Sequence, residues 1–160
     1  MTPRQFIIIL SFTLLLAACD NMSLWKPNMR DKVPSIFPVK ELLYAKQNLH
    51  ALCSLNIFKI QTEFGKTFAD NGFEDASLID NSPSYQPWQD TPIAPKLPDI
   101  SKGHLTIYKA VSCMTEVPHY KDIYEQYRDN KGAFFTTFKI GQIILMYVPK
   151  ENLLFIATYD

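Results

Sequence analysis

Residues 39–68, VKELLYAKQNLHALCSLNIFKIQTEFGKTF, decide the fold that the sequence predicts. Apolar side chains recur in this stretch every three or four residues, which is the spacing of one face of a helix. The set is Leu42, Ala45, Leu49, Leu52, Cys53, Ile57, Ile60, Phe64 and Phe68. A stop signal follows at residues 70–72, Asp-Asn-Gly. The pattern therefore predicts a long helix packed on a sheet, and a helix that lies on a membrane or on a partner is the alternative.

A proline-rich loop is predicted over residues 73–100. Its prolines argue against a long helix or an interior strand, and they are Pro83, Pro87, Pro92, Pro95 and Pro98. The range from Asp70 to Asp90 holds five acidic residues and no basic one. A loop of this length in a small domain is often functional. A surface wrap that covers the core, or disorder, is the alternative.

Three residues of this loop, Tyr85, Trp88 and Asp90, are the predicted binding site for a partner protein. Trp88 would be the anchor, because indole rings dominate the energetics of many interfaces. Carboxylates around it, including Asp80 and Asp99, would speed encounter with a basic surface. A second candidate is the stripe of Tyr120, Tyr124 and Tyr127, whose regular spacing is explained as well by packing in the core.

The C-terminal part predicts a strand, a helix and three more strands. Residues 104–113 alternate well enough for a strand, Pro118 can open a helix, and Gly132 can follow its end. Residues 133–140, 143–148 and 153–159 are β-rich runs joined by short turns. The predicted fold class is α+β, with a long N-terminal helix packed on an antiparallel sheet of about four strands and the proline-rich loop between them.

The N-terminus has the layout of an export signal. Arg4 precedes an apolar stretch at residues 6–16, which is too short to span a bilayer well. The sequence Leu16-Ala17-Ala18-Cys19 resembles the lipobox of bacterial lipoproteins. The resemblance implies that Cys19 receives lipid and becomes the first mature residue. A cleaved secretory signal with an incidental cysteine is the alternative.

This resemblance implies a signal peptide (1–18). Prolines and scattered charges without an apolar period predict a flexible tether (19–38), and the chain length suits a single domain (39–160). The lipid on Cys19 would anchor the protein, since each buried methylene contributes roughly 0.8 kcal/mol. Asp20 and Asn21 resemble the inner-membrane retention signal of enterobacterial lipoproteins. The expected location is therefore the inner membrane, facing the periplasm. If Asp20 is only a polar tether residue, the outer membrane is the alternative.

Two cysteines remain if Cys19 carries lipid. Cys53 and Cys113 are predicted to form a disulfide, because the periplasm is oxidising and leftover pairs there are usually joined. Such a bridge would stabilise the fold by roughly 4 kcal/mol on the chain-entropy model. Two buried free thiols are the alternative.

Composition and motifs argue against several functions. The chain has 16 basic and 16 acidic residues, and removing residues 1–18 removes only Arg4, so a nucleic-acid partner is not expected. It has no nucleophile elbow, phosphate loop or paired-histidine zinc motif. Only His50 with Cys53 and Cys113 gives a weak zinc spacing. We expect no metal, no cofactor and no catalysis.

The predicted function is that of a lipid-anchored, periplasm-facing protein that binds another protein. It would be an accessory subunit of an envelope complex or an immunity protein. One alternative is a module that binds a small ligand or lipid in a cavity between helix and sheet. An enzyme of the cell envelope is the third and least supported alternative.

Overall fold

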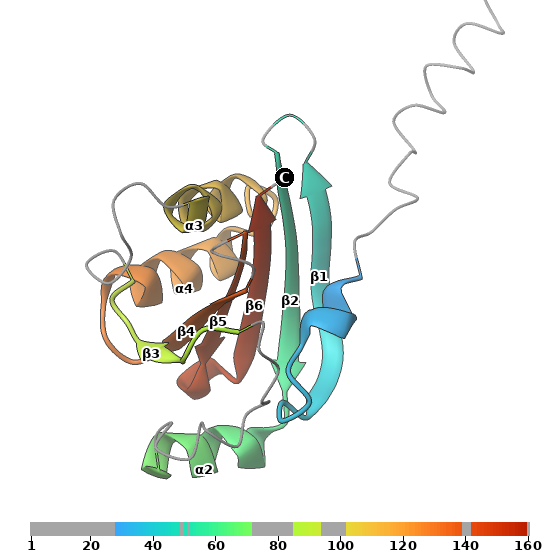
Figure 1. Ribbon diagram of the computed structural model, residues 1–160. Coiled ribbons are helices and arrows are strands. Elements are labelled where there is room, and N and C mark those ends of the chain that lie inside the picture. The colour runs from blue at the N-terminus through green and yellow to red at the C-terminus, as the bar shows by residue number, and fades with distance from the viewer. Residues whose placement is uncertain are drawn as a thin grey trace, which may run out of the picture.

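The computed structural model describes residues 28–48, 50, 52–71, 85–93, 102–138 and 142–159. Its centre is one open antiparallel sheet of six strands in the order β1-β2-β6-β5-β4-β3 (Figure 1). The strands are β1 (Val39–Asn48), β2 (Cys53–Ile60), β3 (Gln89–Asp90), β4 (Phe134–Phe138), β5 (Ile143–Val148) and β6 (Leu153–Tyr159).

The helices in the described residues are short. They are the 3₁₀ turn η1 (Met29–Lys32), α2 (Thr62–Asn71), α3 (Lys102–Ser112), α4 (Pro118–Asp129) and the 3₁₀ turn η4 (Pro149–Glu151). Figure 1 shows α3 and α4 together on one side of the sheet, and α2 beyond the end of the strands. The molecule is therefore a sheet with two helices on one face.

The predicted long N-terminal helix is wrong. Val39–Asn48 and Cys53–Ile60 form the paired antiparallel strands β1 and β2, and a helix begins only at Thr62. Apart from half-buried Lys59, all of β2 is buried, with Leu55 and Ile57 among the residues packed on one face and Phe58 and Ile60 on the other. A strand buried on both faces reads as a nearly continuous apolar run, which periodicity cannot separate from a buried helix.

Strand β1 lacks the alternation of buried and exposed side chains that is typical of a strand, for a second reason. Its pairing with β2 shifts register between Val39 and Glu41 and again between Leu42 and Tyr44. Each irregularity inserts an extra residue and changes which side chains face the core. The core-facing side chains of β1 therefore do not alternate strictly, and the consecutive residues Leu43 and Tyr44 both pack on the same core cluster.

Residues 104–113 are also corrected, because they lie almost entirely in helix α3 and not in a strand. Ile107, Ala110, Cys113 and Met114 are buried, which is the spacing of a helical face. The sheet accordingly has six strands instead of about four. The predicted helix after Pro118 and the three C-terminal strands are confirmed.

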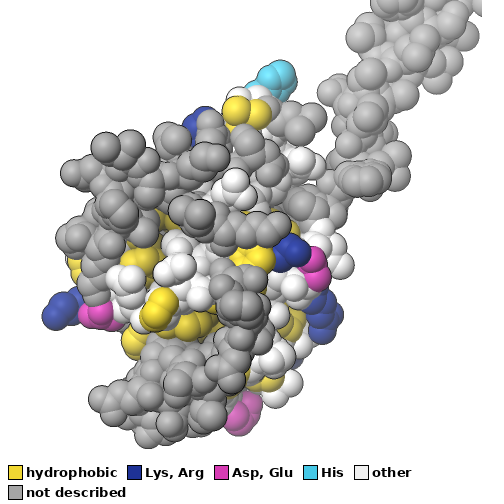
Figure 2. Space-filling model, in the orientation of Figure 1, with side chains coloured by type: hydrophobic (Ala, Val, Ile, Leu, Met, Phe, Trp, Pro, Cys, Tyr) yellow, Lys and Arg dark blue, Asp and Glu magenta, His cyan; other side chains and the backbone are white. Residues whose placement is uncertain are grey.

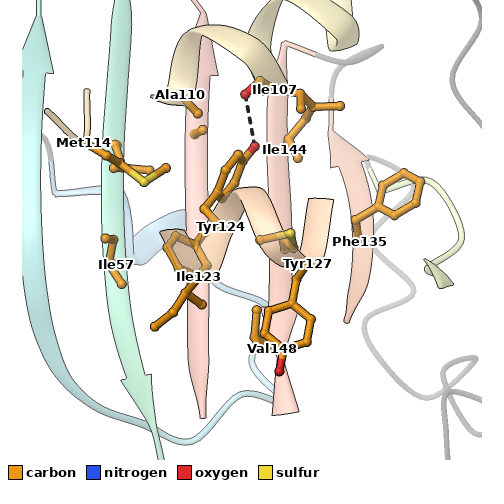
Figure 3. Packing of buried hydrophobic residues seen from close by; sticks show 14 of the residues in the cluster. Ile57, Ile107, Ala110, Met114, Ile123, Tyr124, Tyr127, Phe135, Ile144 and Val148 are labelled. Carbon is orange, nitrogen blue, oxygen red and sulfur yellow. Dashed lines mark hydrogen bonds between the residues drawn. The ribbon is translucent and has the colours of Figure 1, made fainter. Parts of the chain in front are cut away.

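The face of the sheet under α3 and α4 holds the larger core. Ile123, Tyr124 and Tyr127 of α4 pack there with Ile57, Ile144 and Val148 of the strands (Figure 3). The Tyr124 hydroxyl donates a hydrogen bond to the Ile107 carbonyl at 3.3 Å, which joins α4 to α3. We call this side the helix face.

The opposite side, which we call the strap face, is covered by segments with little regular structure. Met29 and Phe37 are buried there against Phe58, Tyr147 and other strand residues. The backbone N–H of Met29 donates to the Oδ1 atom of buried Asn56 at 2.8 Å. Residues 29–38, which the sequence assigned to the tether, therefore lie packed on the sheet.

Candidate binding surfaces

Residues 85–93 run along strand β4 as an added edge. Gln89 and Asp90 pair with Phe135 and Phe134, and Tyr85 forms an isolated bridge with Phe138. The Gln86 N–H donates to the Thr137 carbonyl at 2.9 Å. The prolines argue against an interior strand, and β3 is a strand of only two residues at the edge of the sheet, where the stretch between Pro87 and Pro92 pairs with β4.

The structure brings two of the three predicted partner-binding residues against the N-terminal segment. The half-buried Trp88 packs on Phe37, with ring centroids 5.5 Å apart. The Tyr85 hydroxyl donates to the Lys32 carbonyl at 2.6 Å. Asp90 lies exposed in β3, while Asp80 and Asp99 are outside the described residues. Binding at this site stays a prediction, and both aromatic side chains also help to hold the strap face together.

The leader residues Cys19, Asp20 and Asn21 lie outside the described residues. Within the part of the chain that the structure describes, no helix is long and apolar enough to cross a membrane. The lipid anchor and the membrane location stay predictions.

Cys53 and Cys113 are joined in the structure, with their Sγ atoms 2.10 Å apart and their Cα atoms 6.3 Å apart. Disulfides need Cα atoms roughly 4.4–6.8 Å apart. Cys53 was expected in a helix and Cys113 in a strand. In the structure, Cys53 begins strand β2 and Cys113 follows helix α3. The bridge fastens the end of α3 to the sheet.

The tyrosine stripe of α4 belongs mainly to the core. Tyr124 and Tyr127 are buried, and Tyr120 is half-buried against the same cluster. Burial raises the pKa of the Tyr124 hydroxyl far above its ordinary value. The packing alternative for the stripe therefore accounts for all three side chains.

The outer edge of β1 is a surface that the sequence did not indicate. Strand β1 has ten residues and lies at one end of the strand order, with β2 as its neighbour. Lys40, Glu41, Leu42 and Gln47 are exposed along it. The usual hairpin signal is missing, since no glycine lies between β1 and β2. Only Asn48 marks the turn, by accepting a hydrogen bond from the His50 N–H at 3.0 Å.

A pocket of about 540 Å³ lies between α2, η4 and the start of β4. Lys66 and Lys150 line it together with Phe134 and Pro149. No sequence motif marks these residues, because α2 and η4 lie far apart in the chain and meet only in the folded protein.

Charged side chains of the described residues do not gather in one place on the face shown in Figure 2. Figure 2 shows basic and acidic side chains interspersed with apolar ones on the face it presents. Arg128 donates two hydrogen bonds to the carboxylate of Asp129, at 2.8 and 2.6 Å, and these bonds lower the pKa of Asp129. Within the described ranges, no three His, Cys, Asp or Glu side chains gather as a metal site would require.

No protein-family model, curated protein or solved structure matches this chain. The candidate sites therefore rest on the chemistry and geometry of their own residues.

Proposed function

We propose that this protein is a lipid-anchored envelope protein that binds a second protein close to the membrane, through the outer edge of β1. The observation that carries the proposal is the difference between the two edges of the sheet. One edge is a strand of ten residues, and the other is β3, which has only two.

An open strand edge binds extended peptides because its outward N–H and C=O groups are already aligned for pairing. In β1, the stretch from Tyr44 to Asn48 pairs with β2 without a register shift, so its outer side is regular. Side-chain contacts hold this stretch in place. The Tyr44 hydroxyl donates to the Cys113 carbonyl at 2.9 Å, and Lys46 forms an ion pair with Glu116.

The length of the link to the lipid supports a partner that is also near the membrane. Nine peptide units separate Cys19 from Asn28, where the described structure begins. An extended chain spans at most about 3.5 Å per residue, so Asn28 would lie within about 30 Å of the lipid-bearing residue. The partner is then a membrane protein or a protein tethered to the same bilayer, and it supplies an extended segment.

The small-ligand alternative that uses an aromatic cavity between helix and sheet gains no support. Buried side chains of α3 and α4 pack against the helix face of the described structure. The pocket described above lies elsewhere, between α2 and η4.

Photocrosslinking in cells tests the proposal. A benzophenone amino acid replaces Gln47 on β1 in the full-length chain, and the matched control replaces Gln126, an exposed residue of α4. We expect one discrete adduct from position 47 and none from position 126. Lipidation is followed separately by fatty-acid labelling, which Cys19→Ala should abolish.

Two results would contradict the proposal. Equal adducts from positions 47 and 126 would show that β1 is no special surface. Equal fatty-acid labelling of wild type and Cys19→Ala would remove the anchor. If Cys19→Ala loses the label and also loses the adduct at position 47, the anchor is what brings the partner within reach.

A further inference from the structure

We infer that the pocket between α2 and η4 binds an anionic amphiphile, meaning a phosphate or carboxylate group attached to an apolar body. The inference is independent of the β1 edge, because the pocket uses none of the residues of that strand. Its volume of about 540 Å³ lies within the range of small-molecule sites, which is roughly 300–1,000 Å³.

The walls of the pocket are held by a close approach of α2 to the turn between β5 and β6. Gly65 is buried at the contact, and a Cβ atom there would lie 2.2 Å from Oδ1 of Asn152 and 3.0 Å from the carbonyl oxygen of Pro149. Lys59 of β2 donates a hydrogen bond from its Nζ atom to the Glu151 carbonyl, at 3.0 Å, which ties the turn to the sheet. The helix and the turn are therefore fixed relative to each other.

Charge at the pocket is of one sign among the lining residues that the structure describes. Lys66 and Lys150 contribute ammonium groups, Thr62 contributes a hydroxyl, and none of these described lining residues is acidic. The neighbouring acids Glu63 and Glu151 do not line the pocket. Neither lysine forms an ion pair with another residue of the described ranges. Two ammonium groups at one cavity favour an anionic ligand.

Apart from the amide of Asn152, the other described side chains of the lining are apolar, and they explain why the ligand should carry an apolar body as well as a charge. Phe134, which is half-buried, and Pro149, which is buried, form part of the wall. An apolar body that displaces water from these surfaces gains free energy, whereas a bare anion would leave them wet. A head group between the lysines and an aliphatic or aromatic body against Phe134 satisfies both parts of the site.

The test uses the full-length protein in dodecyl maltoside and titrates hexyl phosphate by calorimetry. The variant Lys66→Gln/Lys150→Gln removes both ammonium groups from the pocket. The matched control, Arg30→Gln/Lys131→Gln, removes the same charge from exposed residues that do not line it. We expect the pocket variant to bind at least 10-fold more weakly than wild type, and the control to bind within 2-fold of wild type.

Two further probes separate the parts of the ligand. Hexanol has the apolar body without the charge, and inorganic phosphate has the charge without the body. We expect each to bind at least 10-fold more weakly than hexyl phosphate. Equal binding of hexyl phosphate to the pocket variant and the control would overturn the inference. So would hexanol or inorganic phosphate binding as tightly as hexyl phosphate.

The source of the amphiphile is decided by competition, once hexyl phosphate binding has been shown. Phosphatidylglycerol added to the micelles displaces hexyl phosphate if the natural ligand is a lipid head group. If it does not displace hexyl phosphate, the ligand is a free organic phosphate or carboxylate, and both results support the inferred chemistry. Circular dichroism melts of all variants exclude unfolding as the cause of lost binding.

Discussion

The two faces of the sheet are closed in different ways. On the helix face, α3 and α4 lay buried side chains on the strands, and the bridge between Cys53 and Cys113 ties α3 to β2. On the strap face, Met29 of η1, Phe37 and the side chains of Tyr85 and Trp88 pack on the strands, and little of this cover is regular structure. Aromatic contacts replace helix packing there, and Phe37 lies 5.0–5.5 Å from the rings of Phe64, Trp88 and Tyr147.

This difference predicts that truncating a buried side chain lowers stability by different amounts on the two faces. When a buried side chain of the helix face is truncated, α3 cannot move far into the cavity that is left, because the disulfide ties its end to β2. A strap can shift, because fewer backbone hydrogen bonds fix it and its neighbours can follow. The cost of a core substitution depends on how well the site can collapse. Stability should therefore depend more strongly on the helix face.

The largest expected effect is that of Phe155→Ala on the helix face. Phe155 is 1% exposed in strand β6 and packs on Tyr124, with ring centroids 5.4 Å apart. The substitution should lower the free energy of unfolding by about 3–5 kcal/mol, toward the upper end of that range. Urea unfolding followed by circular dichroism measures it.

The matched variant on the strap face is Phe37→Ala, which removes the same side chain from a site that is 4% exposed. Its cost should be smaller by about 1 kcal/mol or more, because the strap can relax around the gap. If Phe37→Ala costs as much as Phe155→Ala, the strap is as rigid as the helices and the contrast between the faces is broken.

Removal of the disulfide comes next. The bridge closes a loop across a sequence separation of 60, and Cys53→Ala/Cys113→Ala should cost about 4 kcal/mol on the chain-entropy model. Reduction of the wild-type protein should give the same shift of the urea midpoint. An unchanged midpoint after reduction would show that the bridge does not stabilise the helix face.

Trp88→Ala should have a moderate effect, on the strap face. The half-buried indole loses its contact with Phe37, and we expect a cost of about 1–2 kcal/mol. Tyr85→Phe, which removes only the hydrogen bond to Lys32, should cost about 1 kcal/mol. Unchanged melting of Trp88→Ala together with loss of the crosslinked partner would instead favour the loop as the binding site.

The smallest effect should come from Asp129→Asn at the end of α4. Asp129 fixes Arg128, whose guanidinium lies 5.1 Å from the ring centroid of Tyr108 on α3. The carboxylate has a folded pKa below its ordinary value of 3.8, so its contribution is present above pH about 4 and is lost as pH falls through the folded pKa. Its side chain is half exposed, and solvent screening limits the effect to about 0.5 kcal/mol or less.

The pH dependence of Asp129→Asn checks this prediction. Wild type and variant should differ in urea midpoint at pH 7 and converge near pH 2. A difference that persists at pH 2 would mean that the substitution acts through packing of α4 and not through the carboxylate.

Local sequence patterns predicted a helix and several strands but neither of the two candidate binding surfaces. Pro118 and the aromatic stripe after it predict α4 correctly, and the runs after Gly132 predict β4, β5 and β6. The β1 edge escaped prediction because its apolar residues have a helix-like spacing, and the bulges that fit this spacing to a strand form only when β2 pairs with it. The pocket escaped because Lys66 and Lys150 are 84 positions apart and meet through the contact of Gly65 with Asn152.

By itself, the sequence determined the elements whose signals are local: the proline that opens α4, the short turns between the last strands, and the apolar runs of β5 and β6. Only the tertiary structure decided whether residues 39–60 and 102–112 would be strand or helix. A helix makes its hydrogen bonds within itself, whereas a strand needs partners supplied by other parts of the chain. Strand β2 obtains its partners from β1 and β6, and the β6 residues that pair with it lie about 90–110 positions further along the chain. An apolar segment buried on both faces therefore takes the conformation that its distant neighbours allow.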